Sequence, residues 1–343
     1  MTTPVTDPAA GPDRDTPPPL LLAVDAPSLL HRAHHARVAS DLRDRGGRPA
    51  WALHGMLRQV LDAVERFAPD RVVLGFDDRR ASERADRFGA YKAGRAEKHP
   101  ELVEQIDRAA AMLDAMGLHT VTPAGLEADD VTASAATWAR REGWECVVVT
   151  SDRDAFAHIS ESTKVLRLIN GGIHASPLLD PAKLFTMYGV PAGHYLDYAA
   201  LRGDASDNLP GVSGIGEKAA ALLLEAAGSM QAVWADVEHA GGATLVAALD
   251  SLAVERNGRR VGAGVLRRLV ADGAREQFEF NRSMMAGRDD LDLGLTPDVR
   301  RSTGALPLAE DAVARVAGHL GVTTTTDLAV RVLCGTTPAS RGA

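Results

Sequence analysis

Short apolar runs alternate with longer amphipathic stretches along the first half of the chain. The apolar runs are rich in Leu and Val, which is typical of buried parallel strands, and they lie at Leu20–Val24, Arg71–Phe76, Leu118–Val121, Cys146–Thr150 and Lys164–Ile169. Stretches with helical spacing separate them, at Ser28–Val38, Ala50–Phe67, Leu102–Met116 and Ala128–Glu142. This alternation predicts an α/β fold, with a mostly parallel central sheet flanked by helices on both faces.

The strand signal fades after about residue 180, and the following sequence has helical spacing interrupted by glycines. We therefore predict an α/β core over 20–175 and a helical region over 176–334. Residues 1–19 contain six prolines and few apolar anchors. They are predicted to form a disordered tail, as are residues 335–343.

Composition and charge narrow the class of protein. The 343 residues are 45% hydrophobic and 24% charged, as in ordinary globular proteins. Two cysteines, Cys146 and Cys334, exclude a disulfide framework and a four-cysteine zinc site, and they fit a reducing cytoplasm. No apolar run approaches the length of a membrane span, and the N-terminus lacks the pattern of a secretory signal. The net charge of −8 disfavours a general nucleic-acid coat protein, but not an enzyme that holds metal ions in a carboxylate cluster.

Acidic residues stand where the predicted strands end. They are Asp25, Asp77, Asp152 and Asp154 after strands, and Glu127, Asp129 and Asp130 at the start of a helix. An aspartate after a strand is often only a helix N-cap. That interpretation weakens when several strand ends bring carboxylates to one sheet edge, because such groups repel unless cations separate them. Carboxylates without His or Cys suit Mg²⁺ or Mn²⁺, and two such ions can support phosphodiester hydrolysis.

A glycine-rich hairpin is predicted directly after a further acidic segment, 202–208, which contains Asp204 and Asp207. The glycines that set the turn are Gly211, Gly214 and Gly216. The hairpin, over about 209–228, would present backbone amides and the start of a helix near Lys218 to a DNA phosphate. A plain turn between helices has a similar glycine pattern, and the preceding aspartates favour the phosphate-binding interpretation.

In order and spacing these segments resemble the bacterial 5′-nuclease family, the 5′–3′ exonuclease domain of type I DNA polymerases, which is related to flap endonucleases. The resemblance covers roughly residues 20–290. It is carried by Leu20–Asp25, His31–Ala36, Gly75–Asp77, Arg84, Tyr91–Arg95, Gly125–Val131, Thr150–Asp154 and Gly203–Lys218. It implies a PIN-like core, a helix-hairpin-helix, and cleavage of DNA near a 5′ end or flap in replication and repair. No polymerase domain accompanies these segments, so we expect a free-standing member.

The resemblance also implies a cofactor, two Mg²⁺ or Mn²⁺ ions bound by carboxylates, and a K⁺ ion at the hairpin. It places one divalent ion among Asp25, Asp77, Glu127 and Asp129, and it counts Asp130 among the metal carboxylates as well. It places the other among Asp152, Asp154 and Asp204, with Asp207 near it.

A basic run follows Asp77, from Arg79 to Lys98, and it is either a solvated helix face or an arch over the metals, about 79–100. In the arch interpretation its cations hold the scissile phosphate and a tyrosine stacks on an unpaired base. The residues assigned to these contacts are Lys92, Arg84, Arg95 and Tyr91, with Arg32 as a further phosphate contact.

Three segments depart from the family pattern. Ser151 stands where the family usually has glycine, His31 and His34 replace aromatic residues, and Glu83 replaces another. We expect His31, His34 and His35 to be polar surface or DNA-edge residues rather than a transition-metal site, because hard ions do not need imidazole.

Two other functions compete with a DNA 5′-nuclease. A ribonuclease of the related small nuclease fold is disfavoured by the hairpin and the helical region. A non-catalytic DNA-junction module is disfavoured because every expected carboxylate is present. We expect a monomeric, cytoplasmic, nucleoid-associated enzyme that binds DNA with a 5′ end or flap, works beside a DNA polymerase and does not contact membranes.

Overall fold

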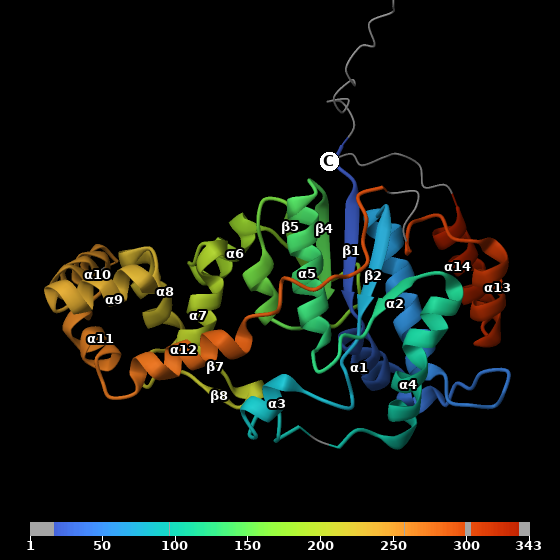
Figure 1. Ribbon diagram of the computed structural model, residues 1–343, viewed down its shortest axis with the longest axis horizontal. Coiled ribbons are helices and arrows are strands. Elements are labelled where there is room, and N and C mark those ends of the chain that lie inside the picture. The colour runs from blue at the N-terminus through green and yellow to red at the C-terminus, as the bar shows by residue number, and fades with distance from the viewer. Residues whose placement is uncertain (1–16, 96, 257, 299–302, 336–343) are drawn as a thin grey trace, which may run out of the picture.

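The computed structural model of the protein describes residues 17–95, 97–256, 258–298 and 303–335. At its centre is a six-stranded sheet with the order β3-β2-β1-β4-β5-β6 (Figure 1). The strands are β1 (Leu20–Asp25), β2 (Arg71–Gly75), β3 (His119–Val121), β4 (Glu145–Thr150), β5 (Thr163–Arg167) and β6 (Leu178–Leu179). All neighbours are parallel except β6, which runs antiparallel to β5. The predicted α/β class with a mostly parallel sheet is therefore confirmed.

One set of helices covers the sheet, and a second set forms a helical region beside it. Those that alternate with the strands are α1 (Ala26–Arg37), α2 (Trp51–Phe67), α3 (Glu83–Arg87), α4 (Pro100–Met116) and α5 (Ala128–Arg141). The helical region contains α6 (Pro181–Tyr188), α7 (Tyr195–Arg202), α8 (Glu217–Ala227), α9 (Met230–Ala240), α10 (Ala243–Glu255), α11 (Gly262–Leu269) and α12 (Ala274–Met285). Two last helices follow, α13 (Glu310–His319) and α14 (Thr323–Cys334). The predicted bounds of the first strands and long helices agree with these within two residues.

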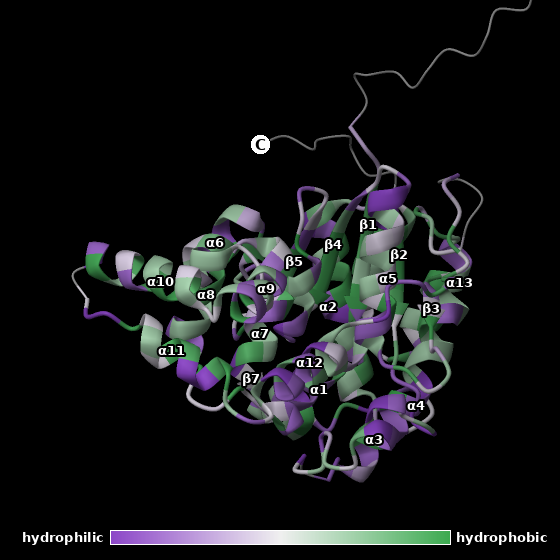
Figure 2. Ribbon diagram, turned by 60° about the vertical axis from the view of Figure 1, so that its left-hand side comes forward, coloured by the Kyte–Doolittle hydropathy of each residue, from purple (hydrophilic) through white to green (hydrophobic). Residues whose placement is uncertain are grey.

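The sheet separates two apolar layers. Along β1, Leu20, Leu22 and Val24 pack with residues of α1, α2 and α4, whereas Leu21 and Ala23 pack with α5 and the helical region. Because both faces are covered, every β1 residue is buried, which explains the continuous apolar run in the sequence. Figure 2 shows the hydrophobic colour concentrated on the central strands, while α3 is hydrophilic.

The last two helices do not belong to the helical region. Helix α13 packs on α4, and α14 packs on α2, so that both complete the apolar layer of the α/β core. A buried hydrogen bond joins His54 Nε2 of α2 to Thr325 Oγ1 of α14 at 2.8 Å. This differs from the predicted helical region over 176–334, because helical spacing in a sequence does not indicate which body a helix packs against. The predicted tails, 1–19 and 335–343, lie almost entirely outside the described residues.

An extended strap over 286–298 leads from α12 back across the core (Figure 1). Its end is held by Arg71, a fully buried residue of β2, which donates hydrogen bonds to the carbonyls of Thr296 (2.7 Å) and Asp298 (3.0 Å). The Arg71 guanidinium also lies 4.9 Å from the ring centroid of Trp144. The strap thereby fixes the helical region to the core.

Within the described ranges, the helices lack the combination of length and apolarity that a bilayer crossing requires. Both cysteines are free, and burial raises the pKa of the Cys146 thiol to about 12. That thiol therefore acts as a small apolar side chain of the core.

Candidate active site

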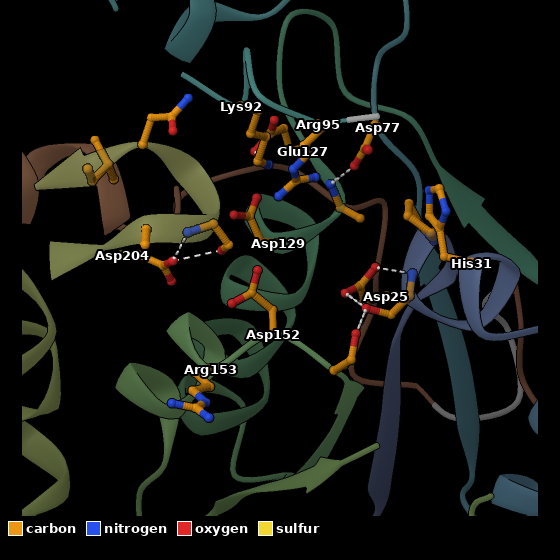
Figure 3. Close-up of a pocket in the computed structure, with 18 of the residues that line it drawn as sticks. Asp25, His31, Asp77, Lys92, Arg95, Glu127, Asp129, Asp152, Arg153 and Asp204 are labelled. Atoms are coloured by element: carbon orange, nitrogen blue, oxygen red, sulfur yellow. Dashed lines mark hydrogen bonds and ion pairs between the residues drawn. The ribbon is translucent and has the colours of Figure 1, made fainter. Parts of the chain in front are cut away.

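A cleft of about 1090 Å³ lies at the carboxyl edge of the sheet, beside the short strands β7 (Gly203–Asp204) and β8 (Leu209–Pro210). Six carboxylates line it, and Figure 3 labels them: Asp25, Asp77, Glu127, Asp129, Asp152 and Asp204. Five cationic side chains line the same cleft: Lys92, Arg95, Lys98, Arg153 and Arg202. Acids that are far apart in the sequence are therefore brought to one site.

Asp25 and Asp77 both accept an amide at the start of a helix and border the cleft. Asp25 ends β1 and caps α1, where its Oδ1 accepts a hydrogen bond from the Ser28 amide (3.0 Å). Its Oδ2 accepts hydrogen bonds from Ser28 Oγ and Thr150 Oγ1, each at 2.6 Å. Burial raises the pKa of Asp25 despite these donors. Asp77 Oδ1 accepts from the Ala128 amide at the start of α5 (3.0 Å). The N-cap interpretation is therefore correct for Asp25, whereas Asp77 binds the first amide of a helix that it does not directly precede, α5, whose own N-cap is Glu127. Both arrangements are compatible with a place in the cleft.

Arg84 of α3 gathers the three acids at the start of α5. Its Nη1 lies 3.0 Å from Glu127 Oε2, 3.2 Å from Asp129 Oδ1 and 3.0 Å from Asp130 Oδ2, and its Nη2 lies 2.9 Å from Asp130 Oδ1. Burial alone would lower the pKa of Arg84, but Asp129 and Asp130 raise it above the usual range. The guanidinium is thus permanently charged and offsets the repulsion among three carboxylates.

Asp130 is placed as a structural residue rather than as a metal ligand. Its side chain is fully buried, and both oxygens bind Arg84. The same oxygens accept the amides of Glu127 (3.0 Å) and Arg288 (2.8 Å). Since Asp130 does not line the cleft, its predicted role as a ligand is not supported by its position.

Glu127 Oε2 is also bound by two residues of the arch. Tyr91 donates its hydroxyl to this oxygen (3.0 Å), and Lys92 Nζ lies 2.8 Å from it. Lys92 has a backbone φ of 55°, unusual for a residue with a side chain, and its ammonium lies 4.7 Å from the centroid of the Tyr91 ring. Burial lowers the pKa of Lys92, but Glu127 and Asp207 outweigh it, so the amine stays charged. With a buried ring and an engaged hydroxyl, Tyr91 lies behind the cleft and does not offer a face to a base.

The second group of acids follows β4. Thr150 Oγ1 accepts the Asp152 amide (3.0 Å), and Asp152 Oδ1 accepts the Asp154 amide (2.9 Å). Burial raises the pKa of Asp152, and burial together with Asp152 and Asp204 raises that of Asp154 well above its usual range. Asp154 Oδ1 is buried without a hydrogen-bond partner. A cation bound here would relieve both the repulsion and the unsatisfied oxygen, so these residues fit a divalent metal.

Two glycines position Asp204. Gly203 has φ 78°, and a Cβ on it would lie 2.2 Å from the Gly211 amide nitrogen. A Cβ on Gly211 would lie 2.1 Å from the Arg202 carbonyl oxygen. Only glycine permits this approach of β7 and β8, which brings Asp204 to the rim of the cleft.

The arch is folded down onto the helical region. Arg84 Nε donates to the Met284 carbonyl (3.0 Å), and Asn208 Nδ2 donates to the Ala90 carbonyl (2.8 Å). Arg95 Nη2 lies 2.7 Å from Asp207 Oδ1, and this carboxylate, like Asp154, is not among the residues that line the cleft. Part of the basic run therefore faces the site, since Lys92, Arg95 and Lys98 line the cleft, whereas Arg80 and Arg87 are exposed.

The hairpin between α7 and α8 buries Val212 and Ile215, exposes Gly214 and Gly216, and leaves Gly211 half-buried. Gly214 has φ 76°, and a Cβ on it would lie 2.9 Å from Cδ of Arg268 in α11. Gly216 lacks both constraints, since its φ is −92° and a Cβ would meet open space. Lys218 is exposed at the start of α8. Of the predicted glycines, Gly211 and Gly214 are required by the backbone and Gly216 is not.

The predicted cation Arg32 lies outside the cleft, where it donates to the Ile169 carbonyl. Three cations that the sequence did not assign to an individual contact do line the cleft, Lys98, Arg153 and Arg202. Arg202 could have been found as the residue directly before Gly203. His31 also lines the cleft, where burial and then Lys98 lower its pKa to about 4 and keep it neutral near pH 7.

Two family models match the chain in succession. The first, described as "5'-3' exonuclease, N-terminal resolvase-like domain", matches residues 20–189. The second, "5'-3' exonuclease, C-terminal SAM fold", matches residues 190–298. Helices α13 and α14 lie beyond both.

Individual relatives agree with these matches. DNA polymerase I of Mycobacterium bovis is 36% identical over 234 residues, which are 68% of this chain and 26% of that protein. The chain thus spans about a quarter of the length of this curated relative. The catalytic core of Rad2 in complex with DNA substrate has a TM-score of 0.54 at 14% identity and covers 92% of both chains. T5 5'-exonuclease with bound zinc has a TM-score of 0.52 at 15% identity, covering 78% of this chain and 100% of the other. At these identities the two structures support the fold.

We expect the metal-free protein to lose stability as the pH rises. The Asp129 side chain borders the cleft and is 31% exposed. Removal of its carboxylate from bulk water is the main cause that raises its pKa to about 8, and the charges of Asp130 and Glu127 add to this shift. The Arg84 guanidinium opposes it. Because this folded-state pKa exceeds the ordinary aspartate value of 3.8, the contribution to stability is complete below 3.8 and lost as the pH rises through 8. Thermal unfolding in a chelator should show Tm falling between about pH 5.5 and pH 8.5, and Mg²⁺ should raise Tm more at the higher pH. An Asp129→Asn variant should show a weaker dependence. Equal Mg²⁺ shifts at both pH values would contradict this expectation.

Proposed function

This chain belongs to the 5′-3′ exonuclease family, and on that premise we propose that it hydrolyses phosphodiester bonds near the 5′ end or 5′ flap of duplex DNA. The observation that carries the proposal is the cleft that six carboxylates and five cationic side chains line together. Carboxylates bind divalent ions and cations bind phosphate, so the combination fits metal-assisted cleavage of a phosphodiester. The DNA substrate in the related Rad2 complex supports the same substrate class.

The proposed cofactor is a pair of divalent ions, Mg²⁺ or Mn²⁺. One would be held by Asp25, Asp77, Glu127 and Asp129, and the other by Asp152 and Asp204, with Asp154 directly behind. When bound, such ions supply an activated water and charge stabilisation at the leaving oxygen. The oxygen-only donor set favours hard ions, and the zinc in the T5 5'-exonuclease structure supports a divalent cofactor.

The protein groups have separate roles in this proposal. Lys92 and Arg95, which line the cleft from the arch, would bind the phosphate next to the scissile bond. Arg84 and Tyr91 lie behind the cleft and act as positioning residues, because they hold Glu127. Thr150 and Ser28 hold Asp25 in the same way.

Duplex DNA would extend from the cleft to the hairpin. Gly211 borders the cleft itself, so the hairpin continues directly from the acidic site. Its exposed turn and Lys218 would contact a backbone phosphate, with K⁺ bound by turn carbonyls. We propose that the chain acts as a monomer. We also propose a DNA polymerase as its functional partner, which the DNA polymerase I relatives support.

Loss of one metal carboxylate should abolish cleavage. Asp25→Asn, Asp77→Asn and Asp152→Asn keep the capping oxygen but remove the charge that holds an ion, so turnover should fall roughly a thousandfold or more. The measurement is single-turnover cleavage of a labelled 5′-flap duplex with and without Mg²⁺. Asp311→Asn, at an exposed position of α13, is the matched control and should match the parent.

Near-parent turnover in one of the three variants would remove that residue from the site. An RNA substrate run in parallel separates the proposal from a ribonuclease, which would cleave RNA faster. Binding without cleavage by the parent in Mg²⁺ would instead indicate a junction-binding module.

The different roles of Lys92 and Arg84 should appear in the stability of their alanine variants. Lys92→Ala should lower kcat more than it weakens duplex binding, because its ammonium meets charge that develops in the transition state. Arg84→Ala should also lower the free energy of unfolding, by about 3–5 kcal/mol, because it leaves three buried or half-buried carboxylates without their shared cation. Kinetics and urea unfolding provide both readouts. If both variants only raise KM and unfold like the parent, the arch is a plain binding surface.

Alanine variants of two hairpin glycines should differ in their affinity for duplex DNA. Gly214→Ala should weaken duplex binding, because φ 76° disfavours a side chain and the new Cβ would meet Arg268. Gly216→Ala is the matched control and should bind like the parent, since its φ and its surroundings accept a Cβ. Binding should also be tighter in K⁺ than in tetramethylammonium at equal ionic strength, because screening alone does not distinguish the two. Equal binding in both salts would exclude the cation site, and an unaffected Gly214→Ala would exclude the phosphate contact.

A further inference from the structure

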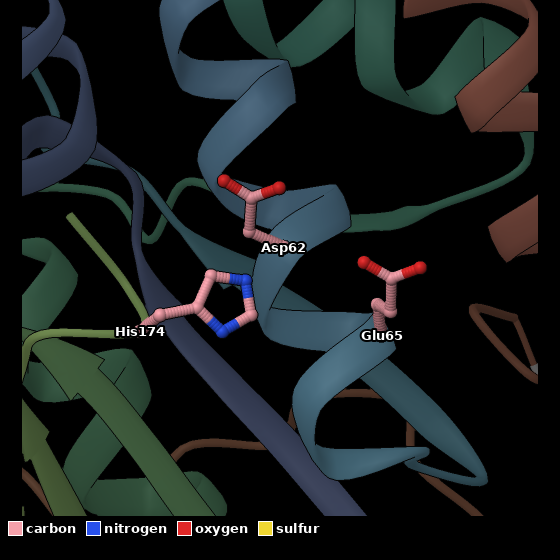
Figure 4. Close-up of side chains that lie close together, drawn as sticks. All are labelled: Asp62, Glu65 and His174. Carbon is pink, nitrogen blue, oxygen red and sulfur yellow. The ribbon is translucent and has the colours of Figure 1, made fainter.

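A second group of metal-ligand side chains lies outside the cleft. Among the residues that the structure describes, Asp62, Glu65 and His174 place one ligand atom each within 4.8 Å of one another (Figure 4). Asp62 and Glu65 are three residues apart on α2 and therefore share a helix face. His174 comes from the loop between β5 and β6. The group shares no residue with the cleft.

The loop that carries His174 is held against α2 on both sides of the histidine. Arg66 of α2 donates from Nη1 to the carbonyls of Ile173 and Ser176. The buried Ser176 hydroxyl in turn donates to the Gly172 carbonyl (2.8 Å) and accepts the Ile169 amide (3.1 Å). The backbone on both sides of His174 is therefore held next to α2 by the fold itself, independently of any ion.

From this geometry we propose that Asp62, Glu65 and His174 form a binding site for a borderline transition ion such as Zn²⁺ or Co²⁺. One imidazole and two carboxylates form a mixed nitrogen and oxygen set, which suits these ions better than Mg²⁺. The cleft has oxygen donors only, so the two sites select different metals. Bonds of about 2.0–2.2 Å require the ligand atoms to approach slightly, which the exposed ends of Glu65 and His174 allow.

Two arginines compete with an ion at this site. Arg58 Nε lies 3.1 Å from Asp62 Oδ1, and Arg331 Nη1 of α14 lies 2.7 Å from Glu65 Oε1. The Arg331–Glu65 pair is exposed on both sides, so it opposes metal binding only weakly. Removing Arg331 should therefore strengthen binding, whereas removing His174 should weaken it. Opposite effects of two neighbouring variants are difficult to obtain from non-specific surface binding.

An ion at this site would also act on the loop. Near the start of the loop, the Ile169 carbonyl accepts a hydrogen bond from Arg32 of α1. An ion would therefore add a further link between the loop and α2, which Arg66 already connects, while Arg32 connects the loop to α1. Bound metal should protect the amides around Ile173 from hydrogen exchange.

The test is a Co²⁺ titration of the full chain in excess Mg²⁺, followed by visible absorption. The parent should bind one Co²⁺ that His174→Gln weakens at least about tenfold and Arg331→Gln strengthens severalfold. His239→Gln removes an exposed histidine of α9 and should titrate like the parent. Asp152→Asn, which disables the proposed catalytic cleft, should keep this Co²⁺ site, so failure of the proposed function and failure of this site are distinguishable.

Three results would overturn the proposal. The first is a His174→Gln titration identical to the parent. The second is loss of the Co²⁺ absorption in Asp152→Asn, which would place the ion in the cleft. The third is weaker binding in Arg331→Gln, which would exclude Glu65 as a ligand that Arg331 competes for.

Discussion

Repulsion among carboxylates at one sheet edge is the constraint on which the site depends. Burial raises the pKa of Asp25, Asp129 and Asp152, so the folded chain holds these acids close together at a cost. Arg84 offsets that cost at the start of α5 with a single guanidinium shared by three acids. Among the described residues, no cation forms a comparable ion pair with the group after β4, and there Asp154 retains a buried oxygen without a hydrogen bond. The fold thus provides cations of its own at the start of α5, Arg84 and Lys92, and a bound metal would offset the charge that remains after β4.

The same constraint explains how the two parts of the molecule depend on each other. Arg84 belongs to the arch, but its Nε is fixed by the Met284 carbonyl of α12. Asp204 belongs to the helical region, and it reaches the cleft only because Gly203 and Gly211 allow two backbones to touch. The buried Asn281 of α12 donates to the carbonyls on both sides of this contact, Ala200 (2.9 Å) and Pro210 (2.8 Å). The positions of the acids therefore depend on contacts between the core and the helical region.

The sequence predicted those parts of the site that local rules determine. Asp25 and Asp152 were identified because parallel strands bring their carboxyl ends to one edge, and Gly211 because a tight turn requires it. The packing of α13 on α4 was not predictable, since periodicity reveals an apolar face but not its partner. The position of Asp130, next to two ligand candidates in sequence but behind the cleft, depends on Arg84 and α5 together. Such roles arise from contacts between distant segments, which spacing alone does not encode.

Charge in the cleft connects metal binding to DNA binding. When all six carboxylates are ionised, which for Asp129 requires a pH above about 8, they outnumber the five cations, and His31 adds no charge because its pKa is lowered to about 4. A cleft in this state disfavours a phosphate backbone, in keeping with a chain whose net charge is −8. Two divalent ions would reverse that balance, after which Lys92 and Arg95 act with the metals instead of only neutralising acids. In the proposed function, the ionised acids of an unloaded cleft would therefore repel DNA phosphates, and metal loading would be a condition for productive binding as well as for chemistry.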